Sequence, residues 1–131
     1  MSAADILNEV VAGGRTPRPV GEGIYSVLPE DAGGHGYDRR AAVYDAVVGT
    51  EGYNRVMWGA ARGAYEAFAR RALAPGGGGL VLDAPCGSLL FSAAAYADSG
   101  RRVVALDQSL GMLRRARARL SGLAGAVPEN V

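Results

Sequence analysis

The chain has 131 residues, of which 49% are hydrophobic, a size and composition that suit one domain with its own core. Its 14 basic and 13 acidic residues leave a formal net charge of +1, so overall charge favours neither nucleic acid nor an anionic membrane as a partner. A single cysteine excludes an internal disulfide and a cysteine-rich metal site, and no apolar run approaches the ~20 residues that span a bilayer.

Residues 2–12 predict a short helix with Ser2 as its cap and an apolar face made of Ile6, Leu7, Val10 and Val11. The first 20 residues lack the basic start and apolar core of a signal peptide, so we expect a cytoplasmic protein. Residues 13–23, rich in Gly, Pro and Arg, break the helix, and a loop is expected through Gly36. His35 lies in this loop without a partner at metal-ligand spacing; a loop histidine is the default interpretation, and a catalytic base is the alternative.

Two helical stretches follow, at residues 38–48 and 53–74. In the second stretch, apolar residues recur at helical spacing and predict a stripe that faces the core. Its members are Val56, Met57, Ala60, Ala64, Ala67, Phe68 and Leu73. The glycine-rich residues 75–79 then predict a hinge that leads into a sheet.

Residues 80–107 have the pattern of a strand, a tight turn, a helix and a second strand. Leu80, Val81 and Leu82 form a short apolar run, which is typical of a parallel strand buried on both faces. After Asp83 the chain must reverse, and residues 85–88 supply what a tight turn into a helix needs: a fixed φ, a position without Cβ and a hydroxyl able to cap the helix. The sequence therefore predicts an α/β fold.

The second strand, residues 103–106, ends in Asp107, and Ser109 is expected to cap a further helix at residues 110–120. The right-handed crossover of a βαβ unit brings both strand ends to one edge of the sheet, so Asp83 and Asp107 should face the same crevice. An acid about 20 residues beyond the turn suits ribose hydroxyls, because a carboxylate accepts two hydrogen bonds at once. This segment therefore predicts a nucleotide-type half-site.

The residues Asp83-Ala84-Pro85-Cys86-Gly87-Ser88, followed by Val104-Ala105-Leu106-Asp107-Gln108-Ser109, resemble the cofactor-binding motif of the class I S-adenosylmethionine-dependent methyltransferases. The resemblance covers residues 80–120 and implies an incomplete Rossmann-like parallel sheet preceded by N-terminal helices. It implies a helical cap or lid at residues 1–74 and the first part of the cofactor-binding domain at residues 75–131. A dinucleotide-binding fold is the rival, but its G-x-G-x-x-G order is absent.

The resemblance also implies roles for individual residues. The methionine part of S-adenosylmethionine would be lined by Asp83, Ala84, Cys86, Gly87 and Ser88. Asp107 would hold the ribose, Gln108 and Met112 would flank the adenine, and S-adenosylhomocysteine would be the product. The sequence departs from the family at Leu89, where a third glycine is usual. Its side chain either points into the helix packing or narrows the cofactor pocket, and we interpret it as the first apolar residue of the helix.

Other candidate residues have two interpretations each. Cys86 is either a small residue packed beneath the turn, which we favour, or a nucleophile. The last helix carries four arginines that form either a solvated face, which we favour, or phosphate contacts: Arg114, Arg115, Arg117 and Arg119. Segments similar to Tyr37-Asp38 and Tyr44-Asp45 precede the cofactor motif in many small-molecule methyltransferases, where they belong to a lid; packing of the two aromatic rings is the alternative. Tyr53, Arg55 and Trp58 are candidates for a substrate pocket.

The position of the motif in the chain bears on function. The resembling fold has its first strand in the centre of a larger sheet, so residues 80–83 would have one unpaired edge here. A longer enzyme of which this is the N-terminal part is the favoured explanation, because the chain ends where a third strand would begin; a homodimer or strand exchange and a degenerate relative are the others. We expect methyl transfer to a small molecule, with catalytic residues unassigned and this chain inactive alone. The alternative is a non-catalytic module that self-associates through an open sheet edge.

Overall fold

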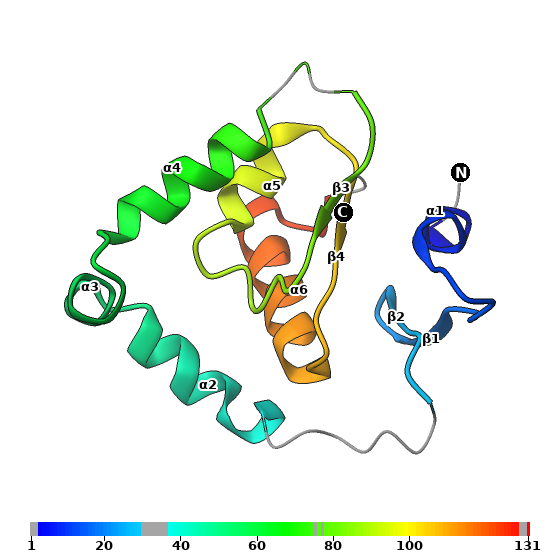
Figure 1. The fold of residues 1–131 in the computed structure, drawn as a ribbon, viewed down its shortest axis with the longest axis horizontal. Helices are drawn as coiled ribbons and strands as arrows, with labels where there is room; N and C mark the ends of the chain where they lie inside the picture. The colour runs from blue at the N-terminus through cyan, green and yellow to red at the C-terminus, as the bar shows by residue number, and fades with distance from the viewer. Residues whose placement is uncertain (1–2, 30–36, 75, 77, 129–130) are drawn as a thin grey trace. The chain divides into compact units, whose positions relative to one another are not determined.

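The computed structural model describes residues 3–29, 37–74, 76, 78–128 and 131. The chain forms two compact units, Met1–Gly33 and Gly34–Val131, which are described separately (Figure 1).

The first unit consists of helix α1, Ala3–Val10, and an antiparallel hairpin of β1, Arg18–Gly21, and β2, Ile24–Ser26. The helix confirms the prediction, whereas its proposed cap Ser2 lies outside the described residues, as does His35. The hairpin was not predicted, because its Gly and Pro content favours a loop. Its turn has φ values of 55° at Glu22 and 73° at Gly23, and two successive positive values are typical of the two-residue turns that join antiparallel strands.

The second unit contains a parallel pair of strands, β3 at Val81–Asp83 and β4 at Val103–Ala105. Helix α5, Ala93–Ser99, connects them, and helix α6, Leu110–Ala124, follows β4. Before the sheet come α2 at Tyr37–Val48, α3 at Glu51–Tyr53, the π-helix η1 at Asn54–Trp58 and α4 at Arg62–Ala72. The α/β class predicted from the sequence is therefore present as a β-α-β unit with a two-stranded sheet.

The core lies between one face of the sheet and helices α5 and α6. Val81, Val103 and Ala105 point to this face, because alternate residues of a strand share one side and Val81 is in register with Val103. The buried core residues are Leu73, Leu89, Ala93, Ala95, Tyr96, Val103, Ala116 and Leu120. Leu82 points the other way and is 54% exposed, so the prediction of a strand buried on both faces is wrong at this residue.

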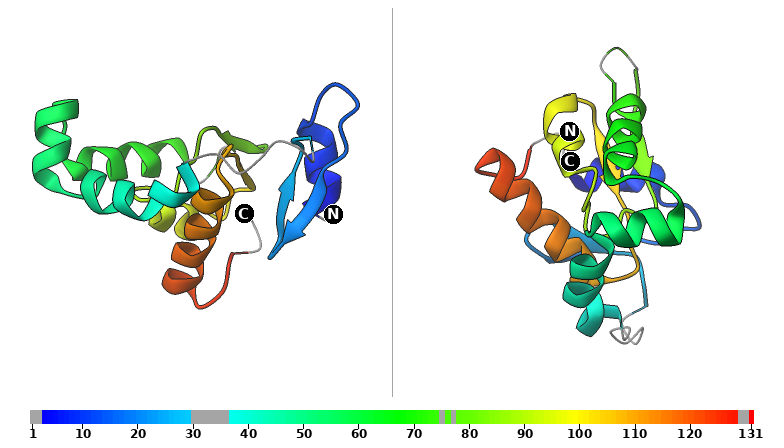
Figure 2. Two further views of the ribbon diagram at one scale, coloured as in Figure 1. Left: turned by 90° about the horizontal axis from the view of Figure 1, so that it is seen from below. Right: turned by 90° about the vertical axis from the view of Figure 1, so that its left-hand side faces the viewer.

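Helices α2, α3, η1 and α4 run around the outside of the α5–α6 pair, with α2 against α6 and α4 against α5 (Figure 1 and Figure 2). The single helix predicted for residues 53–74 is wrong, because the chain turns at Gly59, whose φ is 65°. Among the described residues, no helix has the length and apolar character needed to cross a bilayer.

The apolar stripe predicted for this region is also largely wrong. Val56, Met57 and Phe68 are 82%, 60% and 65% exposed, and of the large side chains in the predicted stripe Leu73 alone is buried. The inner face of α4 instead carries Tyr65 and Ala69, four residues apart, which lead to Leu73. The ring of Tyr65 stacks on Phe91 with 5.1 Å between the ring centroids, and this contact joins α4 to the segment that precedes α5. The break at Gly59 uncouples the two halves of the pattern, so their apolar residues do not share one face.

The helix after the turn begins at Ala93 rather than Leu89 and ends as predicted at Gly100, which has a φ of 63°. Leu89 has a φ of 54° and a side chain that is 1% exposed. It is therefore a buried residue in left-handed backbone, not the first residue of a helix. Ser109 caps α6 as predicted, since its hydroxyl accepts a hydrogen bond from the Met112 backbone N–H, and the helix continues four residues beyond the predicted end to Ala124.

Candidate functional site

The turn at residues 84–88 is attached to the carboxyl ends of both strands. The backbone N–H of Leu106 donates to the carbonyl of Asp83 at 2.9 Å, and the N–H of Cys86 donates to the carbonyl of Leu106 at 2.8 Å. These bonds extend the β3–β4 ladder past the strands and hold the turn beside the end of β4. The prediction that Asp83 and Asp107 lie at one edge of a sheet is confirmed, since β3 and β4 are parallel neighbours and each acid is at or just after its strand end.

Asp107 joins the turn to the start of helix α6. One carboxylate oxygen accepts the Gly87 N–H at 2.9 Å, and the other accepts the Ser109 N–H at 2.8 Å. A carboxylate oxygen has two lone pairs, so each oxygen can still accept a second hydrogen bond. Asp107 therefore orders the turn and retains acceptor capacity on both oxygens.

Asp83 is held from helix α5. The hydroxyl of Tyr96, a residue 2% exposed, donates to a carboxylate oxygen of Asp83. Burial raises the pKa of Tyr96, and the neighbouring Asp83 carboxylate raises it further. The phenol therefore stays protonated at neutral pH and acts as a donor that fixes the direction of the Asp83 side chain.

Cys86 is a partly buried residue that packs against the core. Burial raises the pKa of its thiol to about 12, with further contributions from the Asp107 and Asp83 carboxylates. A thiol of this kind is almost wholly protonated at neutral pH, whereas the thiolate is the nucleophilic form. These data support the structural interpretation of Cys86 over the nucleophilic one.

Ser88 is 5% exposed, and both of its polar groups are used within the protein. Its hydroxyl donates to Asp45 of helix α2 at 2.6 Å, and its carbonyl accepts a hydrogen bond from Arg119 of helix α6. The sequence suggested a helix cap at Ser88, but α5 has Ser92 at its N-cap position and no side-chain capping bond. The hydroxyl of Ser88 therefore connects the turn to α2.

The buried Asp45 forms a charge cluster with two partly exposed arginines of α6. Its carboxylate accepts from Nε of Arg115 at 2.9 Å and from a terminal nitrogen of Arg119 at 3.1 Å. Burial acts to raise the pKa of Asp45, but the hydrogen bonds from Ser88, Arg115 and Arg119 outweigh it, so that the pKa lies below its ordinary value. Asp45 is therefore a carboxylate at neutral pH.

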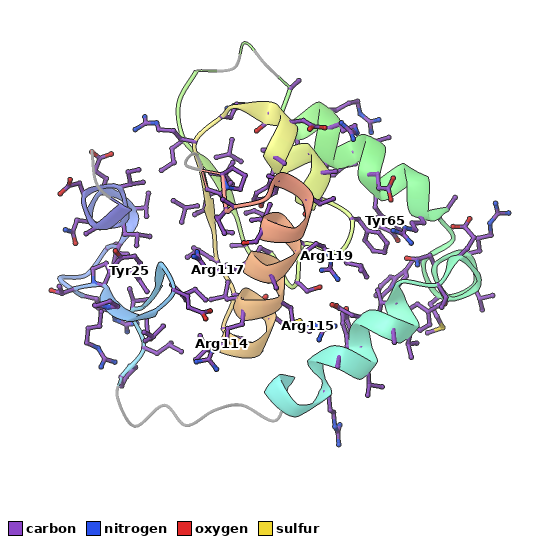
Figure 3. The ribbon with its side chains drawn as sticks, turned by 180° about the vertical axis from the view of Figure 1, so that it is seen from behind. Tyr25, Tyr65, Arg114, Arg115, Arg117 and Arg119 are labelled. Atoms are coloured by element: carbon purple, nitrogen blue, oxygen red, sulfur yellow. The ribbon has the colours of Figure 1, made fainter. Side chains whose placement is uncertain are left out.

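Figure 3 shows Arg115 and Arg119 on one side of α6, and Arg114 and Arg117 on the other. The prediction of one solvated arginine face is therefore wrong for Arg115 and Arg119, which bind Asp45. The sequence offered a weak signal for this cluster. Two arginines four residues apart share a helix side, but the acid that pairs with them lies 70 residues before Arg115.

The remaining predicted cofactor residues differ in how much surface they offer a ligand. Ala84 and Gln108 are exposed, whereas Met112 is 5% exposed. A Cβ built on Gly87 would meet no atom within 4 Å, so the turn has open space above this residue. Leu89 belongs to the core cluster, and its side chain therefore points into the packing and does not narrow the space above the turn.

The predicted lid and substrate residues are dispersed over three segments. Tyr37 begins α2, but its side chain lies outside the description, as does that of Asp38; Tyr44 follows on the same helix and is 46% exposed. Tyr53 ends α3 and is partly buried, while Trp58 ends η1 and is 58% exposed. These four residues are positioned by α2 and by the α3–η1 segment, and not by the helix that precedes the sheet.

Comparisons of this chain with family models, with curated proteins and with solved structures found no match.

Proposed function

We propose that the turn and strand ends of the second unit bind S-adenosylmethionine, as the cofactor-binding half-site of an enzyme that methylates a small molecule. On this proposal the two strands begin a Rossmann-like sheet. The observation that carries it is the glycine turn bracketed by Asp83 and Asp107 at the carboxyl edge of two parallel strands, which is where open α/β sheets bind nucleotide ligands.

The residues at the turn fit this cofactor in their chemistry. Asp107 retains acceptor capacity on both oxygens, as two neighbouring ribose hydroxyls require. The open space above Gly87 allows a ligand to approach the backbone closely, and the exposed Gln108 follows directly on Asp107. When bound, S-adenosylmethionine supplies a methyl group on a sulfonium. The part of this chain is to bind and orient that group, because methyl transfer needs the acceptor aligned behind the methyl carbon.

Titration calorimetry with S-adenosylhomocysteine tests the proposal. The wild type should bind, and Asp107→Ala should lose most of the heat. Loss of two hydrogen bonds to a charged acceptor costs about 3 kcal/mol, which is a roughly 100-fold rise in Kd. Asp98→Ala is the matched control, since Asp98 is an exposed acid of α5 that pairs with Arg70 and does not touch the turn.

Asp107 also accepts two backbone hydrogen bonds, so each variant is first checked for folding by circular dichroism. A folded wild type that does not bind would contradict the proposal, as would an equal loss of affinity in Asp98→Ala.

A specific observation also favours the alternative of a self-associating module. Within the part of the chain that the structure describes, β3 and β4 pair with each other and with no third strand, and Leu82 is 54% exposed. Unpaired strand edges beside apolar surface recruit other strands. This alternative predicts a dimer in size-exclusion chromatography that Leu82→Glu shifts to the monomer. A monomeric wild type at all concentrations tested would exclude it.

A further inference from the structure

We infer that Asp45 is a positioning residue for the cofactor turn, through which helix α2 controls how well the turn binds its ligand. This inference rests on the proposed function and extends it to the regulation of the same site. Asp45 touches the turn through the Ser88 hydroxyl, 43 residues away in sequence.

The turn is held from two directions. On the sheet side, the Asp107 carboxylate accepts the Gly87 N–H at 2.9 Å. On the helical side, Asp45 accepts the Ser88 hydroxyl at 2.6 Å, and Arg119 bonds both the Ser88 carbonyl and the Asp45 carboxylate. Because Asp45 and Arg119 bind each other as well as Ser88, a shift of α2 relative to α6 must strain at least one of these bonds. The position of α2 is thereby transmitted to the residue next to Gly87.

The burial and hydrogen bonds of Asp45 leave its side chain little freedom to move. Asp45 itself is 7% exposed, and Arg115 donates to the same carboxylate oxygen as Arg119. At the end of α2, a Cβ on Gly49 would lie 2.7 Å from the Asp45 carbonyl oxygen and 3.7 Å from a methyl group of Leu90. The end of α2 is thus packed directly against the chain that leaves the turn.

The end of α2 is also fixed by Asn54, which is 1% exposed. Its side-chain amide donates to the carbonyl of Val48 at 2.5 Å and to that of Thr50 at 2.7 Å. The bond to Val48 satisfies a carbonyl that the end of α2 leaves without a partner inside the helix, whereas the Thr50 carbonyl also accepts the backbone N–H of Asn54. Hydrogen bonds therefore connect η1 through α2 to Ser88, those at Val48 and Ser88 are buried, and such networks act as units.

A double-mutant cycle on ligand binding tests the inference. S-adenosylhomocysteine is titrated into the wild type, Asp45→Asn, Ser88→Ala and the double variant, all in the full chain. We expect each single variant to raise Kd about tenfold, equivalent to about 1.4 kcal/mol, and the double variant to be no weaker than either single one. A residue that merely stabilises the fold would lower the melting temperature without this coupling in Kd.

Glu51→Gln is the matched control. Glu51 also binds two groups from arginine residues, the side chain of Arg55 at 2.8 Å and the backbone N–H of Arg62 at 3.0 Å, but it does not contact the turn. Its substitution should leave Kd unchanged. Amide hydrogen exchange adds a readout without ligand, in which Asp45→Asn should accelerate exchange in residues 86–92 more than Glu51→Gln does.

The outcomes separate the two proposals. If the folded wild type does not bind the ligand, the proposed function fails and the role of Asp45 in it fails as well. If the wild type binds and Asp45→Asn binds equally well, or if the effects of Asp45→Asn and Ser88→Ala on Kd are additive, the inference about Asp45 alone is wrong.

Discussion

Leu89 combines two features that act in opposite directions on stability. Its φ of 54° lies in the left-handed region, where a residue with a side chain costs about 1–2 kcal/mol more than in ordinary backbone. Its side chain is 1% exposed and packs in the core with Tyr96 and Leu120. Leu89→Ala keeps the strain and removes buried methyl groups, so we expect a loss of about 3 kcal/mol in the free energy of unfolding.

Leu89→Gly removes slightly more apolar surface but also removes the strain. In a helix interior, exchange of Ala for Gly costs about 1 kcal/mol, and Ala97→Gly in the middle of α5 serves as that reference. At residue 89, glycine removes about 1–2 kcal/mol of backbone strain, and this gain offsets the cost of the exchange. Leu89→Gly should therefore be no less stable than Leu89→Ala. Urea unfolding followed by circular dichroism measures both differences. Equal slopes of the free energy of unfolding against urea concentration would show that all variants unfold between the same folded and unfolded states.

The strain assigned to Leu89 is contradicted if Leu89→Gly is less stable than Leu89→Ala by as much as Ala97→Gly is less stable than the wild type. In that case residue 89 would have no preference for glycine. Its backbone would not be left-handed in solution, and the departure from the glycine of the resembling family would carry no cost.

Two further predictions concern titratable groups. The pKa of Asp45 is lowered in the folded chain, so the unfolded state binds more protons in acid. We expect the wild type to be more stable than Asp45→Asn by about 2 kcal/mol. This advantage should be complete above the ordinary Asp pKa of about 4 and should decline as the pH falls through the lowered pKa. Urea unfolding at several pH values measures this, and a difference that does not change with pH would contradict the role of the charge. Burial and two carboxylates raise the pKa of Cys86 to about 12, so a thiol reagent at pH 8 should react roughly 1,000-fold more slowly with the native chain than with the chain in urea. Equal rates in both would show that the thiol is not buried.

Local signals in the sequence predicted the features that depend on neighbouring residues. The order strand, turn, helix, strand follows from two apolar runs around a Gly- and Pro-containing turn, and the structure has it at β3, α5 and β4. Gly100 ends its helix with a φ of 63°, and Ser109 caps the next one. Both residues act through backbone conformation or a hydrogen bond within a single turn, which their identity alone indicates.

Features that depend on tertiary packing were not predicted. A glycine such as Gly59 is tolerated inside helices, so its role as a break, with a φ of 65°, is decided by the packing of α4 against α5. The left-handed backbone of Leu89 contradicts the intrinsic preference of leucine, and no local pattern indicates that a side chain at this residue would be buried in the core. The Asp45 cluster joins residues 43, 70 and 74 positions apart, and nothing in a local pattern indicates such a pairing.

Leu89, with its strained backbone, directly follows Ser88, which is bonded to Asp45 and Arg119, and this proximity has a testable consequence. A strained conformation persists only where its surroundings hold it firmly. Ser88 is held at both its hydroxyl and its carbonyl, and the N–H of Leu89 donates to the Cys86 carbonyl at 3.3 Å. If the bonds to Ser88 hold the strain, Asp45→Asn should let residue 89 relax toward ordinary backbone. In the Asp45→Asn background, the free energy of unfolding of Leu89→Gly should then fall below that of Leu89→Ala by an amount that approaches the cost of glycine at a helical site, about 1 kcal/mol. An unchanged difference between the two backgrounds would mean that residue 89 keeps its left-handed backbone without Asp45.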